Sequence, residues 1–234
     1  MTFSAQGIHA GYGRIPVVHD LCFDVAAGGY LGIVGANGAG KSTLLKALSG
    51  VVTPHAGTIR LGDEDLTGVP AWDRARRGLA FVPESRELFG DLTVEEHLHA
   101  GCLRVRGRAK RAERTEFAYE LFPVLRDLRR RAAGRLSGGQ QQSLAVARAV
   151  VSQPRVLLLD EPSLGLSPIA VSGLVESLTR LARTGDMAVV IAEQSLTVVR
   201  ELCDDVLVLN LGREVERGPA AAVLTRSVIE NAFL

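Results

Sequence analysis

At residues 35–42 the chain reads Gly35-Ala36-Asn37-Gly38-Ala39-Gly40-Lys41-Ser42. This is a complete G-x-x-x-x-G-K-[ST] pattern. Glycines let the backbone curl so that successive N–H groups point at phosphate oxygens, and a helix that begins here adds its positive N-terminus. Lys41 can then reach the terminal phosphates of a nucleotide, and Ser42 can offer its hydroxyl to Mg²⁺. The stretch therefore predicts a nucleotide phosphate loop rather than an ordinary glycine-rich turn.

The flanking residues fit the same prediction. Residues 30–34 are continuously apolar and predict a buried strand, and residues 41–48 place three leucines on one helical face. Later in the chain, apolar runs at 156–159 and 187–192 alternate with a helical pattern at 171–183. Uninterrupted apolar strands that alternate with helices predict a parallel sheet covered on both faces.

Two acidic residues end the apolar run Val156-Leu157-Leu158-Leu159, namely Asp160 and Glu161. Ligands of open α/β sheets bind at the carboxyl ends of the strands, so we expect Asp160 to meet Lys41 there. An aspartate at this place holds Mg²⁺ directly or through water, and Glu161 can orient the attacking water. Without the phosphate loop, the same residues would only mark the end of a strand.

A third motif, Leu136-Ser137-Gly138-Gly139-Gln140, distinguishes between families of phosphate-loop proteins. Ser137 and Gln140 form a capping-box pattern at a helix start, and the bare glycine backbone there can bind an anion. The intact motif resembles the signature of the ATP-binding-cassette (ABC) ATPases. The resemblance runs over residues 2–234. It implies an α/β P-loop NTPase with a RecA-like parallel-sheet core, an antiparallel β subdomain and a helical signature subdomain.

The resemblance implies a division of the chain and a set of ligands. Residues 1–234 would form one ABC ATPase domain, with residues 1–87 and 152–234 as the ATP-binding core and about 88–151 as the helical subdomain. The implied ligands are ATP and Mg²⁺. The implied catalytic residues are Glu161 and Gln194, and the implied metal ligands are Ser42, Asp160 and Glu84.

The remaining implied site residues bind nucleotide. Tyr12, between two glycines, would stack on adenine, and Val17 would pack near the same base. The implied contacts with the rest of ATP are Gly35, Ala36, Asn37, Gly38, Ala39, Gly40, Lys41, Ser42, Thr43 and Glu84. Across a dimer, the γ-phosphate held by one subunit would meet the signature residues of the other, which are Ser137, Gly138, Gly139 and Gln140.

Some positions depart from the general ABC pattern and indicate a branch of the family. Glu84 stands where a glutamine is usual, Gln194 stands where the switch histidine is usual, and Ser167 stands where many members carry aspartate. Three segments together resemble the branched-chain amino acid importer ATPases, specifically the shorter of two partner subunits. They are Val82-Pro83-Glu84 with Arg86, Glu161-Pro162-Ser163-Leu164-Gly165-Leu166, and Glu193-Gln194.

The branch resemblance implies several partners. They are a second ABC ATPase subunit, forming a heterodimer or else a homodimer, transmembrane permease subunits and, indirectly, an extracytoplasmic substrate-binding protein. Three alternatives stay open: a urea or short-amide importer, a soluble ABC ATPase acting on DNA or ribosomes, and a non-hydrolysing regulatory cassette. The single cassette without a long insertion argues against the second, and Glu161 argues against the third.

Composition limits the remaining possibilities. A formal net charge of +1 creates no field that recruits nucleic acid, so we expect no nucleic-acid partner. No apolar run reaches the ~18–20 residues that span a bilayer, and the N-terminus lacks a signal-peptide layout. We therefore expect a cytoplasmic protein, held at the inner face of the cell membrane by its partners. We interpret His97 and His99 as surface residues, and the basic segment 104–114 as a solvated face or a partner contact.

Overall fold

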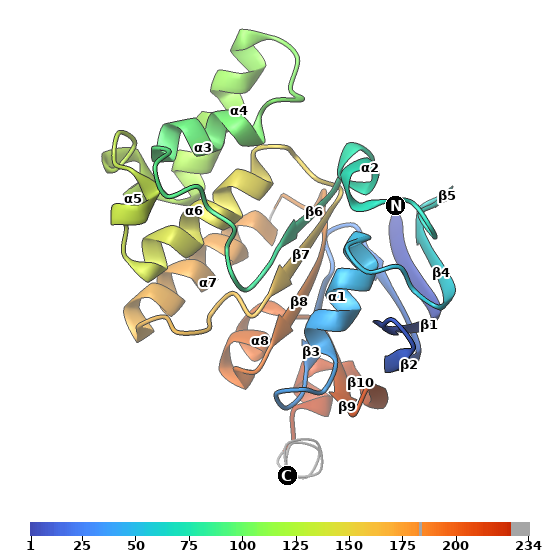
Figure 1. Cartoon of the computed structure of the whole chain (residues 1–234). Helices are drawn as coiled ribbons and strands as arrows, with labels where there is room; N and C mark the ends of the chain where they lie inside the picture. Colours follow the sequence, from blue (N-terminus) through green and yellow to red (C-terminus); the bar gives the residue numbers. More distant parts are fainter. Residues whose placement is uncertain (183, 226–234) are drawn as a thin grey trace.

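The computed structural model describes residues 1–182 and 184–225, so the last residue of the helix predicted at 171–183 lies outside it. The chain forms two sheets and a layer of helices (Figure 1). The larger sheet has six strands in the order β10-β9-β3-β8-β7-β6. Their bounds are β3 Tyr30–Val34, β6 Leu79–Val82, β7 Val156–Asp160, β8 Ala188–Glu193, β9 Asp205–Asn210 and β10 Arg213–Pro219. The strands from β9 to β6 pair in parallel, and β10 is antiparallel to β9.

The smaller sheet is antiparallel and has the order β2-β1-β4-β5. Its bounds are β1 Thr2–Tyr12, β2 Ile15–Ala26, β4 Ala56–Leu61 and β5 Glu64–Asp65. Helix α1, Lys41–Ser49, lies between this sheet and the parallel one, and the short α2, Ala71–Arg76, follows β5 (Figure 1). The two sheets and the helical layer confirm the predicted fold class.

A group of helices covers the other side of the parallel sheet (Figure 1). It comprises α3 Val94–Gly101, α4 Arg108–Leu121, α5 Pro123–Asp127, α6 Gly138–Val150, α7 Pro168–Ala182 and α8 Leu196–Leu202, and the short α9 Ala220–Val223 follows β10. Capping boxes start α3 at Thr93 and α6 at Ser137, and the second is predicted from the sequence. In each, the hydroxyl and the third-residue side chain satisfy backbone N–H groups that a helix start leaves free.

Alternate residues of the parallel strands pack into two separate hydrophobic cores. On β7, Leu157 and Leu159 pack among the helices, whereas Val156 and Leu158 pack toward α1 and the antiparallel sheet. Successive side chains of a strand point to opposite faces, so a strand covered on both faces has to be apolar throughout. This is the physical reason why the continuous apolar runs predict the central strands.

The expectation that His97 lies on the surface is wrong. His99 is exposed, as expected, but His97 is fully buried. Its Nε2 accepts a hydrogen bond from the N–H of Phe89 at 3.0 Å, and its Nδ1 lies 2.9 Å from the carbonyl oxygen of Thr93. Two residues apart on a helix, the histidines face different sides, and the inner one holds the loop that enters α3.

Candidate nucleotide site

The phosphate loop forms the turn from β3 into α1. Gly40, the residue before the helix, has φ +105°, a conformation that residues with a Cβ rarely adopt. At Gly35, a Cβ atom would lie 2.2 Å from the carbonyl oxygen of Leu209, so only glycine fits against β9. The Nζ of Lys41 donates to the carbonyl oxygens of Gly35 at 2.8 Å and Ala36 at 3.2 Å. The lysine thereby folds back over the loop that precedes it.

Glu161 lies against the same lysine. Its Oε1 is 3.0 Å from Lys41 Nζ, and both side chains are buried. Glu161 has φ +48°, in the left-handed region, and its N–H donates to the carbonyl oxygen of Ala192 on β8 at 2.8 Å. A non-glycine residue in this conformation costs about 1–3 kcal/mol, and such strain clusters at functional sites. The geometry aims a carboxylate from the end of β7 at the phosphate loop.

Ser42 and Asp160 supply oxygen atoms beside this pair. The Oγ of Ser42 donates to Oδ1 of Asp160 over 2.9 Å. Burial raises the pKa of Asp160, the hydrogen bond from Ser42 lowers it, and the neighbouring charge of Glu161 raises it. A hydroxyl and a buried carboxylate are oxygen donors of the kind that Mg²⁺ prefers, so this donor set fits that ion.

A cavity of about 460 Å³ opens over the loop. It is lined by Tyr12, Val17, Asn37, Gly38, Ala39, Gly40, Lys41, Ser42, Thr43, Glu84, Glu161 and Leu164. Tyr12 is 49% exposed, and its hydroxyl lies 3.5 Å from Oγ1 of Thr43, which leaves much of its ring accessible. Most of the predicted nucleotide contacts therefore come together around one space, and Leu164 joins them although no motif assigned it.

Several predicted residues, Asp160 among them, lie outside this lining. The carbonyl groups of Gly35 and Ala36 accept hydrogen bonds from Lys41, but neither residue lines the cavity. Gln194 is exposed and directly follows the last residue of β8. Ser137, Gly139 and Gln140 line a different cavity of about 520 Å³, together with α7 residues such as Ile169 and Ala170. Within one chain, the phosphate loop and the signature thus face separate spaces.

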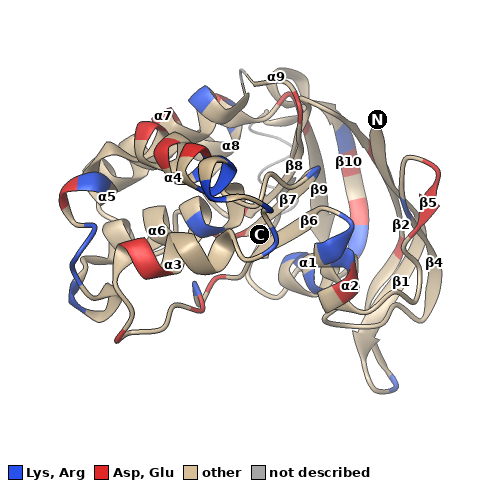
Figure 2. Ribbon diagram, turned by 90° about the horizontal axis from the view of Figure 1, so that it is seen from above, with Lys and Arg blue, Asp and Glu red and all other residues tan. Residues whose placement is uncertain are grey.

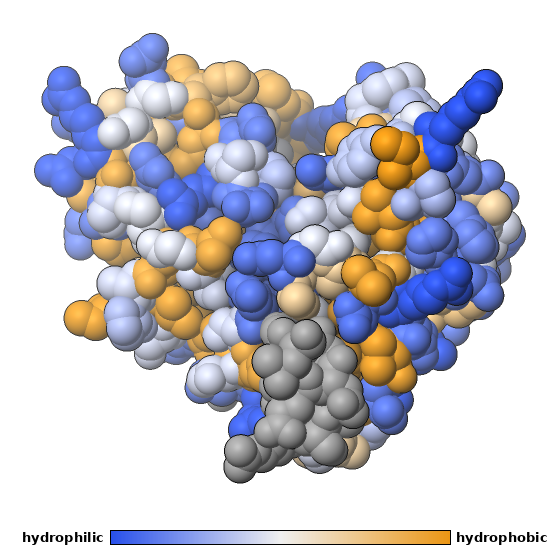
Figure 3. Space-filling model, turned by 60° about the horizontal axis from the view of Figure 1, so that its bottom comes forward, coloured by the Kyte–Doolittle hydropathy of each residue, from blue (hydrophilic) through white to orange (hydrophobic). Residues whose placement is uncertain are grey.

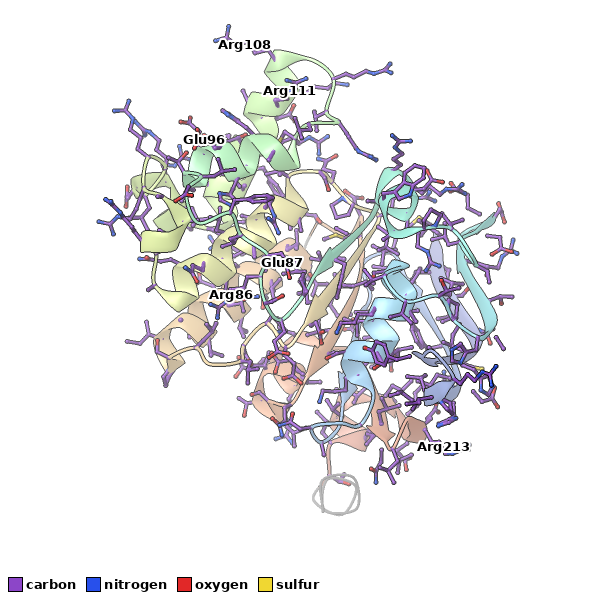
Figure 4. All side chains as sticks on the ribbon, viewed as in Figure 1. Arg86, Glu87, Glu96, Arg108, Arg111 and Arg213 are labelled. Carbon is purple, nitrogen blue, oxygen red and sulfur yellow. The ribbon has the colours of Figure 1, made fainter. Side chains whose placement is uncertain are left out.

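Two arginines fasten the loop after β6 to the signature helix. Arg86 Nε donates to Oε1 of Gln142 at 3.0 Å, and its Nη1 donates to Oε1 of Gln141 at 3.3 Å. In return, Arg148 of α6 donates to the carbonyl oxygens of Glu87 at 2.6 Å and Arg86 at 3.1 Å. Figure 4 shows Arg86 and Glu87 where the helical layer meets the parallel sheet. The same loop carries Glu84 into the nucleotide cavity.

Glu193 is a residue whose role the motifs did not predict. It ends β8 and is 1% exposed, and its carboxylate accepts hydrogen bonds from the backbone N–H groups of Ser163 and Ser195. A carboxylate at the end of an apolar strand is the same signal that identifies Asp160. Its partners, however, come from two loops that are distant in the sequence.

Residues 18–164 match the ABC transporter family. The chain is 41% identical to the high-affinity branched-chain amino acid transport ATP-binding protein BraG of Pseudomonas aeruginosa, over 95% of each chain. It is 34% identical to a probable branched-chain amino acid transport ATP-binding protein, LivF, of Archaeoglobus fulgidus, over 96% of this chain and 94% of that one. A solved ATP-binding subunit of an ABC transporter superposes with a TM-score of 0.83 at 26% identity, over 95% of this chain and 92% of that one.

The fold and the phosphate loop define a P-loop ATPase with an inserted helical signature region. The match over residues 18–164 and the identity with these relatives then place the chain more closely: it belongs to the ABC transporter family. As a member of this family it binds ATP and hydrolyses it to drive transport. Members of the family dimerise and work with transmembrane permeases. No helix among residues 1–182 and 184–225 is long and apolar enough to cross a membrane itself.

Proposed function

We propose that this chain is the ATPase subunit of an importer for branched-chain amino acids. One observation carries the ATPase part of the proposal: Lys41, Ser42 and Glu161, from the ends of β3 and β7, line one cavity, and Asp160 accepts a hydrogen bond from Ser42. The cargo rests on the similarity to BraG and LivF, whose names specify branched-chain amino acid transport. Residues 1–87 and 152–234 then act as the ATP-binding core, and residues 88–151 as the signature subdomain.

Each residue of the site takes a definite role in this proposal. The loop residues 35–43 hold the phosphates, Tyr12 stacks on the adenine, and Val17 packs beside it. Mg²⁺ is held by Ser42 and Asp160, with Glu84 reaching its shell from the loop after β6. Arg86 is the arginine nearest to Glu84 in the sequence, but its guanidinium is hydrogen-bonded to Gln141 and Gln142. We therefore assign Mg²⁺ as the positive charge that balances Glu84.

Hydrolysis is assigned to two residues. Glu161 accepts a proton from the attacking water or orients it, and Gln194 donates a hydrogen bond to the γ-phosphate. Positioned acid–base groups contribute on the order of 10²–10⁴-fold to a rate. Glu161→Gln should therefore bind ATP and hydrolyse it more slowly by a factor in this range. Retention of more than about half of the rate at saturating ATP would assign the role to another group.

The remaining assignments concern location and assembly. The chain works in the cytoplasm, at the inner face of the membrane, on two permease subunits. Its ATPase partner is a related but different chain. An extracytoplasmic binding protein delivers the cargo to the permeases, so no residue of this chain contacts the cargo.

Uptake measurements test the proposed cargo. In cells that lack this chain, uptake of labelled leucine, isoleucine and valine should fall. Wild-type protein should restore uptake, and Glu161→Gln should not. Labelled urea and a short amide, measured in the same cells, should be unaffected. If only urea or amide uptake falls, the transported substrate is urea or a short amide instead of branched-chain amino acids. If uptake of every labelled compound is unchanged, the importer assignment is wrong, and only the assignment as an ATPase remains.

A further inference from the structure

Glu193 is a buried carboxylate in an unusual setting. It is the last residue of β8 and is 1% exposed, and it forms no ion pair within residues 1–182 and 184–225. Moving an ionised group out of water is costly unless hydrogen bonds satisfy it. Backbone amides do so here, because both carboxylate oxygens accept N–H groups. Oε1 is 2.8 Å from the nitrogen of Ser163, and Oε2 is 3.2 Å from the nitrogen of Ser195.

The two amides belong to loops that flank the site of hydrolysis. Ser163 is two residues after Glu161, and Ser195 directly follows Gln194. One carboxylate therefore joins the loop of the water-orienting residue to the loop of the phosphate-contacting residue. Burial raises the pKa of Glu193 above its ordinary value; hydrogen bonds from Ser163 and Ser195 oppose this rise, and the nearby charge of Glu161 adds to it.

The sheet register places this carboxylate centrally. Glu193 is paired with Val34, the residue before the phosphate loop, and Ala192 is paired with Asp160. Ala192 also accepts the N–H of Glu161 at 2.8 Å. The end of β8 thus lies between the phosphate loop on one side and the acidic residues at and just after the end of β7 on the other, and Glu193 is the side chain at that end.

We propose that Glu193 is a positioning residue for ATP hydrolysis: its carboxylate fixes the loop after Glu161 relative to the loop that carries Gln194. The inference rests on the proposed role of Glu161. Charge-assisted hydrogen bonds to fixed amides hold a backbone more firmly than neutral ones. A small misplacement of a reacting group lowers a rate steeply, so the two bonds bear on turnover more than on nucleotide binding.

The variant Glu193→Gln tests this directly. The amide keeps one acceptor oxygen, but its NH₂ group faces the second backbone N–H, so one of the two ties is lost. We expect kcat per nucleotide-binding site to fall by about 10–100-fold, while KM for MgATP changes by less than about threefold. Counting bound nucleotide corrects for any unfolded fraction. The matched control is Asp65→Asn, which alters a carboxylate that caps the N–H of Thr67 at 2.8 Å on β5, in the antiparallel sheet, and should leave kcat unchanged.

A second variant removes a donor instead of the acceptor. Ser195 has φ −76°, which proline can adopt, so Ser195→Pro deletes one N–H while keeping Glu193. We expect it also to lower kcat by about tenfold or more. If both variants bind a full complement of nucleotide and turn it over at the wild-type rate, the positioning role is wrong.

A double-mutant cycle separates this inference from the site assignment. If Glu193 acts through Glu161, adding Glu193→Gln to Glu161→Gln should slow single-turnover hydrolysis by less than about twofold. Additive losses would overturn the inference while leaving Glu161 in place. A fast Glu161→Gln single variant would instead reject the proposed role of Glu161, whatever Glu193 does.

Discussion

Lys41 is a single cation shared by several oxygen atoms. Its Nζ lies 2.8 Å from the carbonyl oxygen of Gly35 and 3.0 Å from Oε1 of Glu161, almost out of contact with solvent. Low polarity strengthens the attraction between such a charge and phosphate oxygens. Its removal also leaves a buried carboxylate without its cation, which is costly in itself.

We therefore expect Lys41→Ala to lose hydrolysis by ~10²-fold or more and to bind MgATP more weakly. Isothermal titration and a phosphate-release assay measure the two effects. Lys46→Ala is the matched control, because it removes a lysine from the same helix outside the cavity lining. Equal affinity and turnover in wild type and Lys41→Ala would mean that the loop does not hold the phosphates.

Gln194 makes a separate prediction about pH. An amide donates and accepts hydrogen bonds but does not titrate near neutrality, whereas an unperturbed histidine titrates near pH 6.5. If the Gln194 side chain reaches the γ-phosphate, Gln194→His should add an inflection near pH 6.5 to the plot of ATPase rate against pH. The wild-type plot should have no inflection that is due to residue 194. The ATPase rate measured from pH 5.5 to 8.5, at saturating MgATP, checks it. Superimposable profiles would show that the side chain does not contact the phosphate.

At the scale of elements, Arg74 anchors the far end of the phosphate-loop helix. This α2 residue is 1% exposed, and its guanidinium donates to the carbonyl oxygens of Ala47 at 2.9 Å, Leu48 at 2.7 Å and Val69 at 2.7 Å. Burial lowers its pKa to about 10, so it stays charged at neutral pH. A cation at this end of α1 satisfies free carbonyl groups and complements the helix dipole.

Arg74→Met should lower the free energy of unfolding by about 2–5 kcal/mol, because it removes the buried guanidinium that donates to three carbonyl oxygens. Urea denaturation checks this through the midpoint at constant m-value. Arg76→Met, two residues later, removes an exposed guanidinium that lies 4.9 Å above the ring of Trp72. That control should cost at most ~1 kcal/mol. Similar midpoints for the two variants would contradict the anchoring role.

The elements also show how far sequence patterns reach. The apolar run predicted at 30–34 has the same bounds as β3, since a strand covered on both faces is mostly apolar along its length. The helix predicted from 171 instead begins at Pro168, because proline fits the first helical turn, where its missing N–H is not needed. Local patterns do not predict the burial of Arg74 and His97. Their hydrogen-bond partners are backbone groups that come close only when the chain is folded.

The candidate site shows the same limit. The lysine, serine, aspartate and glutamate around the phosphate loop could be predicted because each stands in a short motif with a known mechanism. Glu193, Leu164 and the bonds between Arg86 and α6 could not, since they depend on which loops meet at the edge of the parallel sheet. Contacts between loops that are distant in the sequence depend on the tertiary structure, and the spacing of residues within a motif does not predict them.

At the scale of the whole molecule, charge and apolar surface are both dispersed. Basic and acidic residues are mixed along the ribbon (Figure 2). The basic residues Arg108 and Arg111 lie on α4 at the far end of the helical layer (Figure 4). The face brought forward in Figure 3 carries hydrophobic residues in several separate clusters among hydrophilic ones. The role of the basic segment 104–114 stays a prediction.

The arrangement of the two cavities fits a site that two chains complete together. The phosphate loop lines one space, and Ser137, Gly139 and Gln140 line another, where Ile169 is 87% exposed. One γ-phosphate cannot meet both anion sites of the same chain if they open into different spaces. We propose a head-to-tail pair, in which each phosphate loop is closed by the other chain's signature. In such a pair we expect ATP to bind the closed form better than the open one and to shift the population toward it.

We therefore expect the Glu161→Gln variant to sediment as a monomer without nucleotide and as a dimer with MgATP and the partner ATPase. Slow hydrolysis preserves the ATP that joins the two chains. Ser137→Ala, which removes the hydroxyl that caps α6, is expected to weaken the nucleotide-dependent pair while leaving ATP binding to its own phosphate loop unchanged. Sedimentation velocity of each variant, alone and with the partner, with and without MgATP, provides the measurement. A nucleotide-dependent dimer of this chain alone would assign a homodimer, and a tight dimer that forms without nucleotide would reject ATP as the group that joins the two halves.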